Sequence, residues 1–157
     1  TIVTKQGFNT LASLQMPLQF GDKEVKCSDQ NNDELHGKSL LNKALCLPQT
    51  IGSTTGGLVL YCACAMQKNP ACMLFANHID SLAAAGAVLA DVWVDGVTMP
   101  VIDSLGDEFL NYVKDGMKIT VKANLGQIPL FLNNDSADAK ELAPIFEGAN
   151  WTAIKNF

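Results

Sequence analysis

Short apolar runs, separated by glycine, proline and polar clusters, divide the chain into alternating strand and helix candidates. Residues 40–47 form an apolar strand that stops at Pro48, and residues 58–67 suit a buried helix that ends before Asn69-Pro70. Residues 71–76, ACMLFA, are wholly apolar, which is typical of a strand covered on both faces. This order of elements predicts an α/β fold.

The alternation continues in the second half of the chain. Asp80 or Ser81 is placed to cap a helix over residues 82–91, and a short strand is expected at 100–102. The next helix is predicted over residues 105–116, because its apolar positions 105, 109, 110 and 113 lie on one helical face. These two helices and the strand between them extend the α/β pattern.

Hairpin strands are predicted towards both ends of the chain. Residues 10–20 mix apolar and polar side chains and are assigned to a strand, whereas residues 21–37, rich in Asp, Asn and Gln, are assigned to a surface loop. Residues 117–122 alternate and are expected to pair with residues 128–132. The polar, then amphipathic, tail over residues 133–157 is expected to be a C-terminal extension.

Composition narrows the class of partner. The net charge is −5, and the eleven basic residues are scattered lysines without a single arginine. Nucleic acid is therefore not expected as a partner, and this chain has no guanidinium to clamp a carboxylate or phosphate. No apolar run is long enough to span a bilayer, and the first residues, TIVTKQGFNT, lack the pattern of a secretory signal. These features favour a cytoplasmic location away from the membrane.

The five cysteines favour the same compartment. Four of them, at positions 46, 62, 64 and 72, lie in apolar segments, which is typical of buried reduced thiols in a cytosolic protein. Cys62 and Cys64 are two apart and would point to different faces of a helix, and no Cys-x-x-Cys occurs. We therefore expect no metal site in this chain.

The chemistry is predicted to reside in residues 48–57, PQTIGSTTGG, between the apolar strand and the buried helix. A helix start offers unpaired N–H groups and partial positive charge, so it can bind an anion. Gly52 and Gly56 would let a ligand approach the backbone, and the hydroxyls of Ser53, Thr54 and Thr55 could bond it. The plain alternative is a helix cap with spare hydroxyls. The loop is not a Walker P-loop, a dinucleotide fingerprint or a Gly-x-Ser-x-Gly motif.

A family resemblance gives this loop a more definite meaning. The loop, preceded by LHGKSL, resembles that of the small swivel subunit of the aconitase-X group. The matching segments stand in the family's order across residues 11–130, at 35–40, 42–48, 51–57, 69–71, 80–91, 100–101, 107–116 and 119–121. The resemblance implies a single swivelling β/β/α domain over residues 1–157, like the fourth domain of the aconitase superfamily.

The resemblance also implies an enzyme made of two subunits. A large catalytic aconitase-X subunit would carry an iron–sulfur cluster on its cysteines, and the small subunit would bind no cofactor itself. Together the two would close on a small hydroxy acid and remove water. In aconitase relatives the corresponding loop reads Gly-Ser-Ser-Arg and its first serine is the base, which by this match is Ser53. This sequence departs from that pattern, because it has no arginine in the loop and Ile51 stands where many aconitase-X loops have one.

The predicted substrate is cis-3-hydroxy-L-proline, dehydrated to a pyrroline-2-carboxylate. The stretch HIDSLAAAGAVLADVW resembles the hydroxyproline type, and no lysine lies between Lys43 and Lys68 to attract a phosphate. The alternative within the family is the small subunit of a phosphomevalonate dehydratase. A rival of another class is a non-catalytic anion-binding or phosphocarrier-like swivel domain. A phosphohistidine carrier would need histidine where Ser53 and Thr54 stand.

Other polar residues receive plainer interpretations. His36, beside a glycine, is interpreted as a turn residue, and His78 as a capping or interface residue at the end of a strand. Asp80 is interpreted as a cap rather than an acid. Asp103 or Ser104 is expected to open the helix over residues 105–116, where acidic side chains suit the helix dipole.

Overall fold

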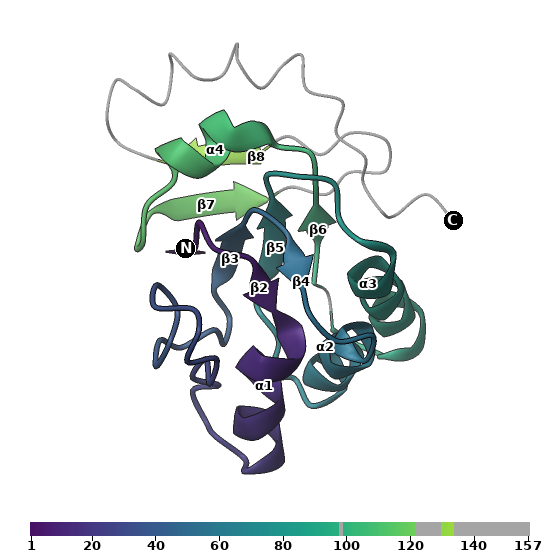
Figure 1. The fold of residues 1–157 in the computed structure, drawn as a ribbon. Helices are drawn as coiled ribbons and strands as arrows, with labels where there is room; N and C mark the ends of the chain where they lie inside the picture. The colour runs from purple at the N-terminus through teal and green to yellow at the C-terminus, as the bar shows by residue number, and fades with distance from the viewer. Residues whose placement is uncertain (98, 122–129, 134–157) are drawn as a thin grey trace.

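The computed structural model describes residues 1–97, 99–121 and 130–133 (Figure 1). The elements, in chain order, are β1 (Ile2–Val3), β2 (Phe8–Asn9), α1 (Thr10–Gln19), β3 (Ala44–Leu47), β4 (Thr50–Ile51), α2 (Gly56–Ala65), β5 (Cys72–Phe75), α3 (Ser81–Trp93), β6 (Val101–Ile102), α4 (Gly106–Tyr112), β7 (Lys118–Val121) and β8 (Leu130–Asn133). Beyond Asn133, the predicted C-terminal extension lies outside the described residues.

Four parallel strands form the central sheet, in the order β1-β3-β5-β6. Successive side chains in a strand point to opposite faces, so the apolar runs of β3 and β5 supply two separate cores. Leu45 and Leu47 belong to one core together with residues of α1, α2 and α3. Cys46 and Leu74 belong to the other core, together with residues of α4. The prediction that residues 71–76 form a strand covered on both faces is confirmed by β5.

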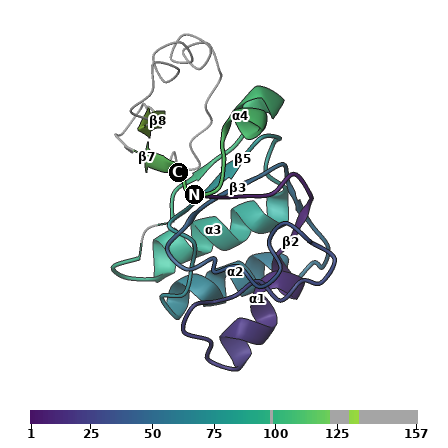
Figure 2. The ribbon, with the colours of Figure 1, turned by 90° about the vertical axis from the view of Figure 1, so that its left-hand side faces the viewer.

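The helices therefore form layers on the two faces of this sheet. Figure 2 shows α1, α2 and α3 on one side of β3 and β5, with α4 on the other side. Outside the central sheet, β2 pairs with β4 in parallel, and β7 pairs with β8 in antiparallel orientation. The α/β class and the pairing predicted for the strands near residues 117–132 are confirmed.

The strand predicted over residues 10–20 is wrong, because this segment is the helix α1. Its buried residues recur at helical spacing: Thr10, Ser13, Leu14, Pro17 and Leu18. Asn9 caps the helix by accepting a hydrogen bond from the N–H of Ala12 at 3.1 Å. A proline inside a helix cannot donate to the carbonyl four residues earlier. Here the N–H and hydroxyl of Ser28 both donate to the Ser13 carbonyl instead, at 3.1 Å each.

Three further expectations need adjustment. The N-terminal region forms no hairpin, because β1 and β2 pair in parallel with later strands. The segment over residues 21–37 is a loop, as predicted, but it is anchored by the fully buried side chains of Val25 and Leu35. Helix α4 begins at Gly106 and ends at Tyr112, because the backbone of Val113 is extended. Among the described residues, no helix is long and apolar enough to cross a membrane.

Candidate active site

The loop over residues 48–57 leaves the sheet at the carboxyl end of β3. The sheet pairing continues past β5, since Asn77 N–H donates to the Pro48 carbonyl at 3.0 Å. Ser104 N–H in turn donates to the Asn77 carbonyl at 3.1 Å. The segments that follow β3, β5 and β6 therefore lie side by side at one edge of the sheet. In α/β sheets this edge is the usual place for a ligand.

The conformation of the loop is fixed by its neighbours. Strand β4 is held by its pairing with β2, in which Asn9 lies opposite Ile51. Gly52 has φ +101°, a left-handed conformation that favours glycine. A Cβ atom at Gly52 would also lie 2.6 Å from Nδ2 of Asn9. Both the backbone angle and the packing against the α1 cap therefore require glycine at this position.

A pocket of about 230 Å³ opens beside this loop. Drug-sized ligands occupy pockets of roughly 300–1,000 Å³, so this one suits a small metabolite. Its wall is built from the first residues of α1, α2 and α3 together with the β4 segment. The lining residues are Thr10, Thr50, Ile51, Gly52, Ser53, Gly56, Gly57, Asp80, Leu82 and Ala83. A single charged side chain, that of Asp80, is among them.

Ser53 lies in the pocket wall, half-buried, three residues before α2 begins. Its Oγ accepts a hydrogen bond from the N–H of Thr55 at 3.2 Å and lies 2.8 Å from Oγ1 of Thr55. Two donors on Thr55 can therefore point at the Ser53 oxygen. Both would stabilise negative charge on that atom, and so would the partial positive charge of the helix start.

The backbone N–H groups at the start of α2 are only partly satisfied. Thr55 occupies the cap position but makes no capping hydrogen bond through its side chain. Gly56 N–H donates to the Ser53 carbonyl at 2.9 Å. The N–H groups of Gly57 and Leu58 have no hydrogen-bond partner among the described residues. The bond from the Thr55 N–H to Oγ of Ser53 is of the kind that a capping serine makes, so the predicted alternative of a capping loop stays open beside the functional one.

Helices α2 and α3 cross with their backbones in contact directly behind the pocket. A Cβ atom on Gly57 would lie 2.0 Å from the Leu82 carbonyl oxygen. A Cβ atom on Gly86 would lie 2.2 Å from the Gly57 carbonyl oxygen. Real Cβ atoms essentially never approach other atoms within 3.0 Å. Because neither glycine has a side chain, the backbones of α2 and α3 can pack in direct contact. This contact places the first residues of both helices in the wall of one pocket.

Asp80 caps α3, as predicted. Its Oδ1 accepts hydrogen bonds from the N–H groups of Leu82 at 2.9 Å and Ala83 at 3.0 Å. Its Oδ2 accepts the hydroxyl hydrogen of Thr50, which ties α3 to β4. Burial by itself raises the pKa of Asp80, but the hydrogen bonds from Thr50, Ala83 and Leu82 outweigh it and lower that pKa below its ordinary value. The pocket wall thus carries an ionised carboxylate at neutral pH.

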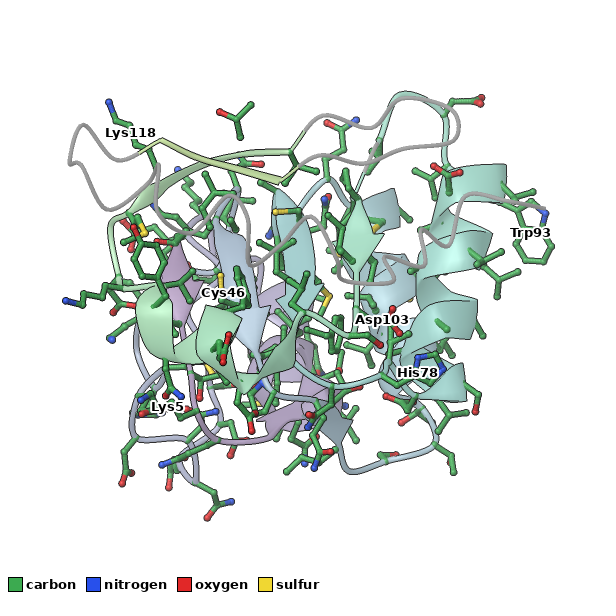
Figure 3. The ribbon with its side chains drawn as sticks, turned by 90° about the horizontal axis from the view of Figure 1, so that it is seen from above. Lys5, Cys46, His78, Trp93, Asp103 and Lys118 are labelled. Atoms are coloured by element: carbon green, nitrogen blue, oxygen red, sulfur yellow. The ribbon has the colours of Figure 1, made fainter. Side chains whose placement is uncertain are left out.

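His78 is paired with a buried acid outside the pocket wall. Figure 3 shows it beside Asp103 at the start of α3, with Trp93 at the other end of that helix. Nδ1 of His78 lies 2.5 Å from Oδ2 of Asp103, which also accepts the N–H of Ile79 at 3.0 Å. Asp103 is 1% exposed and opens no helix, because α4 begins three residues later. The pair therefore joins the segments that follow β5 and β6.

The structure separates the predicted site residues into two groups. Gly52, Ser53 and Gly56 line the pocket, whereas Thr54 and Thr55 are exposed and do not. His36 is an exposed turn residue whose N–H donates to the Asn32 carbonyl at 2.8 Å.

Three polar residues of the wall were not predicted as site residues: Thr10, Thr50 and Asp80. Thr10 was assigned to a strand, and Asp80 only to a cap. A clue to Asp80 was available in the sequence, because it follows the strand next to the loop and parallel strands end at one edge.

The described residues offer no ligand set for a metal. The cysteines at positions 27, 46, 64 and 72 are buried and unpaired, and Cys62 is half-buried. In the described ranges, no three His, Cys, Asp or Glu side chains gather where they could hold an ion. An iron–sulfur cluster does not fit these residues.

Comparison with known proteins identifies the family of this chain. The profile of the Aconitase X swivel domain family matches residues 13–130, which is most of the chain. This chain belongs to that family. The predicted aconitase-X assignment is therefore confirmed for the swivel domain, and all the pocket's lining residues except Thr10 lie within the matched region.

Relatives of this swivel domain are named as dehydratase subunits. The phosphomevalonate dehydratase small subunit of Methanothermobacter thermautotrophicus is 30% identical over 94 residues, which cover 60% of this chain and 66% of that protein. The protein of the same name from Thermococcus kodakarensis is 26% identical over 117 residues, covering 73% of this chain and 80% of that protein. The predicted hydro-lyase class is confirmed by these relatives. Their names refer to phosphomevalonate, the predicted alternative substrate, and not to hydroxyproline.

Solved structures agree with the fold of the swivel domain. The crystal structure of Thermococcus kodakaraensis aconitase X in its holo-form matches with a TM-score of 0.63 at 26% identity, covering 82% of this chain and 85% of that one. A solution NMR structure of a UPF0107 protein matches with a TM-score of 0.61 at 24% identity, covering 82% and 86%. The predicted swivel fold is confirmed.

Proposed function

We propose that this swivel domain is the small subunit of a two-subunit dehydratase, in which Ser53 accepts the α-proton of a small hydroxy acid. One observation carries the proposal: Ser53 lines a metabolite-sized pocket at a helix start where two N–H groups have no partner in the part of the chain that the structure describes. The names of the relatives support the reaction class. Of the residues predicted to bind substrate, Gly52 and Gly56 line the pocket and are proposed to contact it. Thr55 is proposed to position the Ser53 hydroxyl, and Thr54, outside the pocket wall, receives no role.

The geometry around Ser53 suits a base. A free serine hydroxyl is too weakly acidic to be ionised, so its oxyanion needs hydrogen-bond donors and positive charge close by. Thr55 supplies an N–H and a hydroxyl, and the start of α2 supplies partial positive charge. When Ser53 removes the α-proton, the electron pair of that bond forms the α–β double bond and the bond to the β-hydroxyl breaks. The leaving hydroxide becomes water by taking up a proton from solvent, and Ser53 later returns its own proton to solvent. The N–H groups of Gly57 and Leu58 can hold the charge that develops on the substrate carboxylate.

The pocket is proposed to be half of an active site. Among the described residues that line it there is no basic side chain, and two large apolar side chains of its wall are exposed, Ile51 at 48% and Leu82 at 41%. Leu58, the residue after the lining Gly57, is 60% exposed. Exposed apolar groups around a site favour an interface with another protein. We assign this interface to the large subunit, to which the proposal also assigns the iron–sulfur cluster expected for the family. No step given to the present chain uses that cluster.

Two substrates remain candidates. Phosphomevalonate is favoured by the names of the relatives. cis-3-Hydroxy-L-proline is favoured by a different observation, since the charged side chain in the pocket wall is the carboxylate of Asp80. That carboxylate would repel a phosphate and attract a protonated amine.

The test is to purify this chain with its large subunit and to assay the complex on both compounds. We expect a brown complex that dehydrates one of the two. A Ser53→Ala variant should bind that compound and lose most turnover, whereas Ser39→Ala, which removes a hydroxyl outside the pocket wall, should keep it. A stable colourless monomer that captures no partner would contradict the proposal and favour a non-catalytic or phosphocarrier-like domain.

A further inference from the structure

We propose that Thr10, the first residue of α1, is a substrate-binding residue whose hydroxyl forms a hydrogen bond with an oxygen atom of the substrate. That oxygen belongs to the carboxylate or to the leaving hydroxyl, because a β-hydroxy acid carries both groups. This inference rests on the proposed function, since it concerns the pocket that contains Ser53. It goes beyond that function by assigning a contact to a helix that is not part of the Ser53 loop.

The hydrogen bonds within the pocket wall leave Thr10 without a partner. The described wall has four polar side chains, those of Thr10, Thr50, Ser53 and Asp80. The hydroxyl of Thr50 donates to the carboxylate of Asp80, and Oγ of Ser53 lies 2.8 Å from Oγ1 of Thr55. The hydroxyl of Thr10 makes no hydrogen bond to the described residues. Its capacity both to donate and to accept a hydrogen bond is therefore left for a ligand.

The burial of Thr10 gives this missing partner its meaning. Thr10 is 2% exposed, and buried polar groups in proteins are nearly always hydrogen-bonded. The described side-chain oxygens that are sealed from solvent without a partner include Oγ of Ser13 but not Oγ1 of Thr10. An oxygen that has no partner and is not sealed must open to an adjoining space. For Thr10 that space is the pocket, whose wall it helps to form.

The neighbours of Thr10 hold it beside the Ser53 loop. The preceding residue, Asn9, caps α1 and lies opposite Ile51 in the pairing of β2 with β4. A Cβ atom on Gly56 would lie 3.6 Å from Cβ and 3.8 Å from Oγ1 of Thr10. The Thr10 side chain therefore faces the start of α2, three residues after Ser53. Because Gly56 has no side chain, a ligand atom can approach the hydroxyl from this side.

The first experiment measures substrate binding without turnover. Ser53→Ala complexes with the large subunit are titrated by calorimetry with the compound that the wild-type complex dehydrates. Adding Thr10→Val, which replaces the hydroxyl by a methyl group, is expected to weaken binding by about three- to tenfold, the range for one neutral hydrogen bond. Adding Thr10→Ser, which keeps the hydroxyl, should leave binding within about twofold of the parent. Thr10→Ala also removes the hydroxyl and is used if the valine variant assembles poorly.

A structural role for the hydroxyl is tested by melting the same complexes without substrate. The hydroxyl has no partner to lose among the described residues, so Thr10→Val should melt at or above the temperature of the parent. Ser13→Ala is the matched control, because Ser13 lies on the same helix with a fully buried side chain outside the pocket wall. This variant should keep the binding constant of the parent.

A second ligand identifies the oxygen atom that Thr10 contacts. The analogue without the β-hydroxyl is L-proline for cis-3-hydroxy-L-proline, and 3-methyl-5-phosphooxypentanoate for phosphomevalonate. If Thr10→Val weakens binding of substrate and analogue equally, the hydroxyl contacts the carboxylate. If it weakens binding of the substrate alone, the hydroxyl contacts the leaving group. Comparing the two ligands across parent and variant isolates this single contact.

Four results would overturn the role of Thr10. They are unchanged substrate binding in Thr10→Val, an equal loss of binding in Thr10→Ser, the same loss in Ser13→Ala, and a lower melting temperature in Thr10→Val. Failure of both candidate compounds to bind the complex would overturn the proposed function together with this role. Turnover at the normal rate in Ser53→Ala would instead overturn only the role given to Ser53.

Discussion

Replacing Gly57 by alanine is expected to destabilise the domain, although alanine is the better helix former. Gly57 lies in the first turn of α2, where its backbone contacts α3. The added Cβ would lie 2.0 Å from the carbonyl oxygen of Leu82 and 2.9 Å from the carbonyl carbon. Both are backbone atoms, so no side-chain rotation can relieve the clash. The two helices would have to move apart by about 1 Å to reach the 3.0 Å limit for real Cβ contacts.

Two opposing effects set the magnitude. Alanine in place of glycine within a helix gains at most about 1 kcal/mol in intrinsic propensity. Overpacking of a close contact costs about 1–3 kcal/mol, because neighbouring groups leave their best positions. The clash is with backbone, so we expect the upper half of that range and a net loss of about 1–2 kcal/mol. For a chain of this size, that loss lowers the melting temperature by roughly 2–8 °C.

Gly56→Ala is the matched control, because it makes the same change one residue earlier. Its Cβ would lie 3.6 Å from Cβ of Thr10, which is ordinary van der Waals contact. Thermal and urea denaturation of both variants should therefore show Gly57→Ala below the wild type and Gly56→Ala at or above it. Equal stability of the two variants would refute the close helix crossing at Gly57.

Two further predictions concern titratable groups. The folded pKa of Asp80 lies below its ordinary value of 3.8, so its stabilising contribution is present above that pH and is lost as the pH falls through the folded pKa. Asp80→Ala should lower the free energy of unfolding by about 1 kcal/mol at pH 7. Urea denaturation at several pH values should show the difference from the wild type shrinking below about pH 4, and a difference that does not change with pH would contradict this. Burial raises the pKa of Cys46 to about 12 and that of Cys72 to about 11. Iodoacetamide at pH 8 should therefore modify the half-buried Cys62 first, and mass spectrometry showing equally fast labelling of Cys46 would contradict this.

The strand, loop and helix that contain Ser53 could be predicted from the sequence because local signals agree there. An apolar run ends at Pro48, glycines and hydroxyls follow, and a second apolar run begins. The wholly apolar segment over β5 identified a strand buried on both faces, and Asp80 before an alanine-rich stretch identified the α3 cap. In each case one physical effect, burial or capping, acts within a few residues.

Helix α1 could not be predicted in the same way. Pro17 removes a helical hydrogen bond, and the carbonyl of Ser13 receives its replacement from Ser28, which is distant in sequence. Only the folded chain shows that the helix can tolerate this proline. The buried residues of this helix recur at helical spacing, but two of them, Thr10 and Ser13, are polar. The hydrophobic pattern that would indicate a helix is therefore weak.

The composition of the pocket wall could not be predicted from the sequence, because it is formed by contacts between elements that are distant in sequence. Thr10, Thr50 and Asp80 come from α1, β4 and the residue before α3. The pairing of β2 with β4 brings Thr10 near Thr50, and the close contact of α2 and α3 at Gly57 and Gly86 brings the start of α3 to the same wall. The sequence pattern around Gly86 is that of any small-residue helix. Likewise, Asp103 was expected at a helix start, whereas its buried carboxylate accepts the N–H of Ile79 from the neighbouring segment.

The central claim is that Ser53 removes the substrate proton. It is tested most directly by the exchange of the substrate α-proton with deuterium from D₂O, measured by NMR on the two-subunit complex with wild-type chain and with Ser53→Ala. A positioned general base contributes about 10²–10⁴-fold. The account predicts that Ser53→Ala binds substrate with little change and slows both exchange and dehydration by that factor. Exchange and turnover at wild-type rates in Ser53→Ala would contradict it.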